Sequence, residues 1–137
     1  MQTRNRVQVT LALALCLAGA VGCESMEKMG EKLGPKPFQR EIEMDGQVFT
    51  IKSSGTQHSN DGVARLGAQQ WKEAATDLEA AVAEKKTDGL SWKALGVAYE
   101  MAGDKAKAYN AYSQANLLMK EPDALVTRKL GDLKPPQ

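Results

Sequence analysis

The residues that could support chemistry are few, and the most suggestive group surrounds the single histidine. His58 stands next to Ser59 and close to Asp61, which together are the three side-chain types of a hydrolytic triad. A triad is defined by the positions of its side chains in space, so neighbours along a chain do not form one by themselves. The pattern instead favours a surface histidine near the start of a helix.

Patterns typical of metal or phosphate binding do not occur in the sequence. No set of His, Cys, Asp and Glu has the spacing of metal ligands, and there is no glycine-rich phosphate loop. Basic and acidic residues nearly balance, at 18 and 17 of 137 residues, which argues against a nucleic-acid interface. We therefore expect no enzymatic activity, no metal, no cofactor and no nucleic-acid partner.

The N-terminus has the organisation of an export signal. Arg4 and Arg6 precede a run of mostly Leu and Ala from residue 7 to residue 20. That run is shorter than the about 20 apolar residues needed to span a bilayer. Residues 1–22 are therefore predicted to be a signal peptide, and Cys16 is predicted to leave with it.

The end of this segment, Gly22-Cys23, resembles a bacterial lipoprotein signal with its lipobox. The resemblance implies that Cys23 is lipidated and that the exported chain is anchored to a membrane through its acyl chains. Glu24 after the cysteine, rather than Asp, resembles lipoproteins of the outer membrane that face the periplasm in two-membraned bacteria. An ordinary secretory signal with an unmodified Cys23 is the alternative.

Residues 23–37 are predicted to be the lipidated N-terminus and a flexible tether. Lys, Glu and Gly dominate this stretch, and its prolines end any helix. Met26, Met29 and Leu33 fall at helical spacing, so a short amphipathic helix near the lipid surface is the alternative.

Residues 38–54 change to an alternating pattern that predicts a β-hairpin. Asp45-Gly46 separates two β-rich segments, and this dipeptide is a strong signal for a type I′ turn. An isolated hairpin is marginally stable in water, so some of its apolar side chains must pack on helices or on a partner. The candidates are Ile42, Phe49 or Ile51.

The stretch from residue 92 to residue 115 carries a spaced signature of aromatic and small residues. Its members are Trp92, Leu95, Gly96, Tyr99, Ala108, Tyr112 and Ala115. The first four share one face of a helix and the last three share one face of the next. The small residues allow two backbones to approach closely while the large ones fill the space around them. This spacing resembles the tetratricopeptide repeat, with Tyr112 in place of Phe.

A second, divergent copy appears when the signature is shifted by the repeat length of about 34 residues. The matching residues are Gly62, Ala74, Leu78 and Ala81, and Ala64 is aligned with Ala98. Three positions depart from the pattern, because His58, Asp61 and Arg65 stand where Trp92, Leu95 and Tyr99 stand in the other copy. Trp71 is a candidate to fill the resulting space from the second helix.

The fold class predicted is therefore mainly α, a short array of tetratricopeptide-type helical hairpins preceded by the β-hairpin. Residues 55–88 form the divergent first repeat, residues 89–122 the second, and residues 123–137 a capping helix with a disordered tail. Helices are expected at 57–68, 71–85, 88–102, 105–120 and from Pro122 to Leu130, with Gly131 as the stop. Asp88 and Asp104 are predicted N-caps, and Gly103 is predicted to end the third helix.

The resemblance also implies a binding surface, because the first helix of each repeat lines a concave groove in that family. Carried over by position, the partner-binding groove comprises Val63, Leu66, Leu90, Lys93, Val97, Glu100 and Met101. Lys93 is followed by Val97 where family members that bind a C-terminal carboxylate have Asn. Packing against a neighbouring repeat is the alternative role for these residues.

Two repeats are fewer than the three usually needed to bury a continuous core. The hairpin, the capping helix or a partner must therefore cover the remaining apolar faces of the helices. The function predicted is a membrane-anchored, non-catalytic scaffold that binds another envelope protein or peptide, and a second copy of the chain is also a candidate partner. A pilotin-like or outer-membrane assembly role and a structural envelope role are the alternatives.

Overall fold

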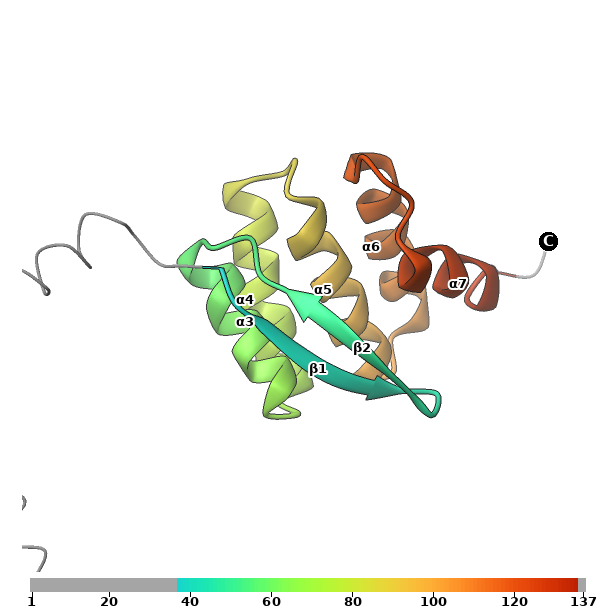
Figure 1. The fold of residues 1–137 in the computed structure, drawn as a ribbon, viewed down its shortest axis with the longest axis horizontal. Coiled ribbons are helices and arrows are strands. Elements are labelled where there is room, and N and C mark those ends of the chain that lie inside the picture. The colour runs from blue at the N-terminus through green and yellow to red at the C-terminus, as the bar shows by residue number, and fades with distance from the viewer. Residues whose placement is uncertain (1–36, 136–137) are drawn as a thin grey trace, which may run out of the picture. The chain divides into compact units, whose positions relative to one another are not determined.

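The structure, a computed structural model, describes residues 37–135 of the chain, which form a β-hairpin followed by five helices (Figure 1). The elements are β1 (Gln39–Met44), β2 (Gln47–Lys52), α3 (Gln57–Gly67), α4 (Trp71–Glu84), α5 (Gly89–Met101), α6 (Lys105–Leu118) and α7 (Ala124–Asp132). The mainly helical fold with a preceding hairpin is confirmed. Among the described residues, no helix has the length and apolar character to cross a membrane.

The hairpin forms a two-stranded antiparallel sheet that lies across the helices. Asp45 and Gly46 both have positive φ, 52° and 72°, as a type I′ turn requires, and Met44 pairs with Gln47 across the turn. Alternation points Ile42 and Ile51 toward the helices, where they are 4% and 0% exposed. The strand β1 packs on α3 and β2 packs on α5.

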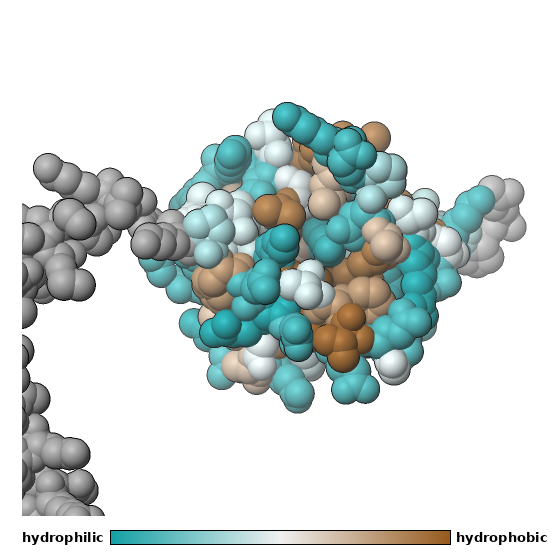
Figure 2. All heavy atoms as spheres, viewed as in Figure 1, coloured by the Kyte–Doolittle hydropathy of each residue, from teal (hydrophilic) through white to brown (hydrophobic). Residues whose placement is uncertain are grey.

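The opposite face of the hairpin is directed to solvent. Figure 2 shows mostly hydrophilic side chains on this side of the molecule, with separate hydrophobic spots among them. The outward positions of the strands include Glu41, Glu43, Thr50 and Lys52, all of them exposed. The hairpin is therefore a cover, apolar beneath and mostly polar above, where Val48 is 63% exposed.

The four helices α3 to α6 pack as two helical hairpins, α3 with α4 and α5 with α6. In each hairpin a glycine brings the two helices together. A Cβ atom built on Gly62 would lie 2.4 Å from Leu78, and one built on Gly96 would lie 2.7 Å from the ring of Tyr112. These two contacts are related by 34 positions, as the shifted alignment predicts.

The helix ends repeat with the same period. Gly103, with φ +92°, follows α5 in the left-handed conformation, and Gln69, with φ 59°, takes the same position after α3. In both turns two backbone N–H groups bond back to the last turn of the helix, at 2.9 and 3.0 Å, which is a Schellman motif. The side chains of Asp88 and Asp104 cap α5 and α6 as predicted.

The last helix differs from its prediction at both ends. It begins at Ala124, because the carboxylate of Asp123 accepts from the Val126 N–H and so takes the N-cap position, leaving Pro122 outside the helix. It ends at Asp132 and includes Gly131, which therefore does not stop it. The helix packs against α6.

Several predictions fall on residues outside the described range. These are the signal peptide (1–22), lipidation at Cys23, most of the tether (23–36) and the end of the tail (136–137).

Candidate functional site

The concave groove implied by the family resemblance is occupied by the chain itself. Val63, Leu66 and Val97 are each 0% exposed and belong to the core together with Ile42 and Ile51 of the hairpin. The predicted partner-binding role must be corrected for these three residues, because the hairpin covers them. Of the other predicted groove residues, Leu90 and Met101 are partly buried.

The two charged residues of the predicted groove bind α7 instead of a partner. The Lys93 ammonium lies 2.7 Å from the carboxylate of Asp123, and the Glu100 carboxylate lies 2.6 Å from the ammonium of Lys129. Burial raises the pKa of Asp123, but the hydrogen bonds from Lys93 and from the Val126 N–H outweigh this and hold it below its ordinary value. These pairs join α5 to α7.

Lys129 is at the centre of a buried charge cluster. Its side chain is 1% exposed and donates to Glu100 and to Asp45 in the hairpin turn, while Tyr112 donates to Glu100 at 2.9 Å. Burial lowers the pKa of Lys129, but the two carboxylates raise it above its ordinary value overall. The cluster thus connects the hairpin turn, α5, α6 and α7.

This buried role of Lys129 was not among the predictions, although the sequence carries a signal for it. Lys129 lies four residues after Leu125 and three after Val126, on the buried stripe of α7. A charged residue on such a stripe requires a buried partner.

The open end of the hairpin is held by buried hydroxyl groups. Ser53 donates to Asn60 at 2.5 Å, and Ser54 N–H donates to Ser59 Oγ at 2.9 Å. Ser91 Oγ lies 2.9 Å from Ser59 Oγ and 2.6 Å from Asp88. The hairpin is therefore fixed at both ends.

The histidine group does not assemble a hydrolytic site. Ser59 is 0% exposed and is engaged with Ser54 and Ser91. His58 Nε2 lies 3.3 Å from Glu84 on α4. Over residues 37–135, no cluster of His, Cys, Asp and Glu could hold a metal ion.

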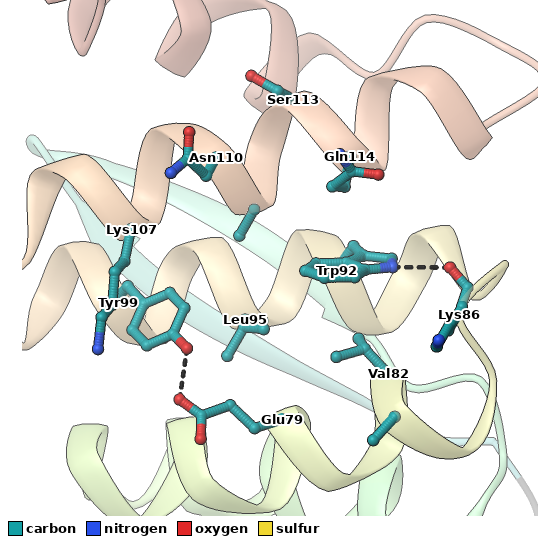
Figure 3. A pocket seen from close by; sticks show the side chains of 12 residues that line it. Glu79, Val82, Lys86, Trp92, Leu95, Tyr99, Lys107, Asn110, Ser113 and Gln114 are labelled. Atoms are coloured by element: carbon teal, nitrogen blue, oxygen red, sulfur yellow. Dashed lines mark hydrogen bonds between the residues drawn. The ribbon is translucent and has the colours of Figure 1, made fainter.

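A different groove is open on the other side of the repeat helices, between α4 and α6 with α5 as its floor (Figure 3). We call it the outer groove; its volume is about 740 Å³. It is lined by Glu79, Val82, Ala83, Lys86, Trp92, Leu95, Tyr99, Lys107, Asn110, Ala111, Ser113 and Gln114. Three predicted signature residues, Trp92, Leu95 and Tyr99, thus form its floor.

The aromatic side chains of the floor are held in place by single hydrogen bonds. The indole N–H of Trp92 donates to the Lys86 carbonyl at 2.9 Å, and the Tyr99 hydroxyl donates to Glu79. The Lys107 ammonium lies 5.4 Å from the centre of the Tyr99 ring. Burial and the Glu79 carboxylate raise the pKa of Tyr99, so this hydroxyl stays protonated at neutral pH.

The departures in the first repeat have a structural reason. No helix precedes α3 within residues 37–135, and His58 and Arg65 are partly exposed and pair with Glu84 and Asp77 of α4, whereas the matching residues of α5 lie between α4 and α6. Arg65 pairs with Asp77 at 2.5 Å. The space beside Gly62 is filled by Leu78, and Trp71 is partly buried and packs against the core.

The remaining signature residues are part of the core. Ala74, Ala81, Ala108 and Ala115 are each at most 1% exposed and lie where the paired helices meet.

Comparison with known proteins gives no family assignment: the chain matches no protein-family model and no curated protein.

Proposed function

We propose that this chain is a lipid-anchored bacterial envelope protein that binds another protein through the outer groove and catalyses no reaction. The observation that supports this most directly is the outer groove itself, which has an apolar and aromatic floor beneath polar walls. Such a surface suits protein binding, because aromatic side chains in concave sites are typical anchors of protein interfaces.

The repeats are proposed to be of the tetratricopeptide type. The glycine contacts at Gly62 and Gly96 support this, as do the matched turns at Gln69 and Gly103. The helix α7 lies against α6 and is proposed to take the place of the first helix of a third repeat, closing the array.

The membrane anchor is proposed to be the acylated Cys23, on the lipobox resemblance of residues 1–23. Two or more acyl chains hold a protein stably at a bilayer, whereas one holds it reversibly. An outer-membrane location facing the periplasm is proposed from Glu24.

The test is site-specific photo-crosslinking of the full chain in a bacterial envelope. A photoreactive residue at Gln114, on the groove wall, is expected to give a discrete protein adduct. The same residue at Asn116, exposed on α6 outside the groove, is the control and is expected to give none.

Two matched substitutions show whether the adduct depends on the groove. Ala83 and Ala106 are both exposed helical alanines, but only Ala83 lines the outer groove. Ala83→Glu is expected to abolish the Gln114 adduct and Ala106→Glu to leave it unchanged. Absence of a discrete adduct at Gln114, or its persistence in Ala83→Glu, would rule out binding at this groove.

The anchor is tested separately by Cys23→Ser. This variant is expected to leave the membrane fraction on cell fractionation, while the parent chain stays with it. Retention of the variant in membranes would contradict the lipid anchor.

A further inference from the structure

We infer that the occupant of the outer groove is an amphipathic helix of the partner, with acidic residues on both sides of its apolar stripe. This inference rests on the proposed function and names the chemistry of the partner at that same site.

The walls of the groove decide between a helical and an extended occupant. Eleven of its twelve lining residues lie within α4, α5 and α6, where backbone N–H and C=O groups bond within the helix. The remaining residue, Lys86, already accepts from Trp92 through its carbonyl. An extended peptide would bury its own backbone groups here with only the side chains of the wall to satisfy them, which is unfavourable. A helix satisfies its backbone internally.

The apolar positions have the spacing that a helix can match. Trp92, Leu95 and Tyr99 lie at i, i+3 and i+7 on α5, which is about 10 Å of floor at 1.5 Å per residue. Leu117 is 76% exposed and lies three residues after Gln114 on the α6 wall, so it extends the apolar surface along that wall. Two to three turns of a partner helix would cover this length.

The charges of the rim specify the flanks of that helix. Lys86 stands beside Trp92 at one end of the groove, and Lys107 stands over Tyr99 at the other (Figure 3). The one carboxylate in the lining, Glu79, already accepts from Tyr99. Acidic side chains two to three turns apart on the partner would meet both lysines, in place of the partly exposed Asp104 carboxylate that lies 3.9 Å from Lys107, and basic ones would be repelled.

The experiment measures binding of synthetic peptides by the fluorescence of Trp92. The full chain is placed in phosphatidylcholine vesicles with Trp71→Phe, which leaves Trp92 as the only tryptophan, and empty vesicles provide the blank. The probes are a stapled helical peptide with a leucine stripe and glutamate flanks, the same peptide with lysine flanks, and a proline-rich extended peptide. The glutamate peptide is expected to shift the Trp92 emission saturably, with a Kd about five- to tenfold lower than the lysine peptide.

A charge reversal gives the sharper test. The double variant Lys86→Glu/Lys107→Glu is expected to reverse this preference. The control variant Lys72→Glu/Lys120→Glu changes the net charge by the same amount at exposed lysines outside the groove. It is expected to retain the preference for the glutamate peptide.

The outcomes separate this inference from the proposed function. Tighter binding of the extended peptide, no saturable shift with the glutamate peptide, or an unchanged preference after charge reversal would each overturn the helical acidic occupant. If the Gln114 adduct nevertheless forms and depends on Ala83, the proposed function stands with a different occupant. If the adduct is also missing, both fail.

Discussion

Gly96 and Tyr112 show how one pair of residues determines the distance between two helices. The ring of Tyr112 occupies the space in which any other residue at position 96 would place its Cβ. Glycine inside a helix costs about 1 kcal/mol relative to alanine. The close contact offsets that cost by allowing a fully buried aromatic ring between the helices.

We expect Gly96→Ala to destabilise the protein by about 1–3 kcal/mol, because its Cβ would lie 2.7 Å from the Tyr112 ring. The matched control is Gly131→Ala in α7, where the added Cβ would meet no atom within 4 Å other than its chain neighbours and its own helix backbone. That change is expected to be neutral or stabilising by up to about 1 kcal/mol. Urea denaturation measures the free energy of unfolding of both variants. Equal changes in the two variants would show that the contact between Gly96 and Tyr112 does not require glycine.

Lys129 supports the prediction with the largest expected effect. Lys129→Met keeps a similar shape but leaves the Glu100 carboxylate, only 15% exposed, without its ammonium partner. Breaking a buried pair in this way costs about 3–5 kcal/mol. The double variant Lys129→Met/Glu100→Gln removes both charges and is expected to regain part of this loss by urea denaturation. No recovery would mean that the packing of the lysine stem, rather than its charge, matters.

Among the helix ends, the turn after α3 is less favourable than the equivalent turn after α5. Both turns need a left-handed residue, but the first uses Gln69 where the second uses Gly103. A residue with a Cβ is strained in this conformation.

Gln69→Gly is therefore expected to stabilise the protein by about 0.5–1 kcal/mol, and Gly103→Gln to destabilise it by a similar amount. Thermal unfolding followed by circular dichroism measures both. The two changes exchange residues between equivalent turns, so shifts of the same sign would contradict the equivalence.

The attachment of α7 should depend on pH through Asp123. Its pKa is held below the ordinary 3.8 in the folded protein, so the folded state binds fewer protons than the unfolded state as the pH falls past about 4. The stabilisation from this carboxylate is complete above that pH and is lost as the pH falls through the folded pKa.

Asp123→Asn keeps an N-cap side chain while removing the charge that pairs with Lys93. We expect a loss of about 1–2 kcal/mol at pH 7 and a smaller further loss between pH 4 and pH 2 than in the parent chain. Unfolding free energies measured across this range provide the check. Parallel curves for the two proteins would exclude Asp123 as the titrating group.

In the assembled fold, polar residues lie at the first end of the helical array. The side of α3 that matches the Trp92 face of α5 carries His58, Asp61 and Arg65. These side chains are partly exposed, no helix precedes α3 within residues 37–135, and His58 and Arg65 pair with carboxylates of α4. The divergence of the first repeat is thus explained by its position at the end.

Replacing these three polar residues of α3 by the matching residues of α5 should create an exposed apolar surface that self-associates. The triple variant His58→Trp/Asp61→Leu/Arg65→Tyr is expected to self-associate as its concentration rises, because the added apolar area has no cover in the described chain. Sedimentation velocity compares it with the parent chain at equal concentrations. Identical distributions would show that this end is already covered.

The β-hairpin allows only two pairs of helices to bury a continuous hydrophobic core. Its inner residues Ile42, Met44 and Ile51 complete the core above α3 and α5, and α7 closes the far end through Lys129. These two elements cover one side of α5, and the outer groove is open on its other side.

The sequence alone determined the elements and their pairing. Helical and alternating periods, the Asp45-Gly46 turn, the capping aspartates and the small residues act between near neighbours or over one repeat length, so local patterns reveal them. Which face of α5 is open depends instead on contacts between residues far apart in the chain. The contacts of Lys129 with Asp45 and of Lys93 with Asp123 join residues 84 and 30 positions apart, and no local pattern specifies such contacts. Burial of Val97 and exposure of the groove over Trp92 follow from where the hairpin and α7 come to rest.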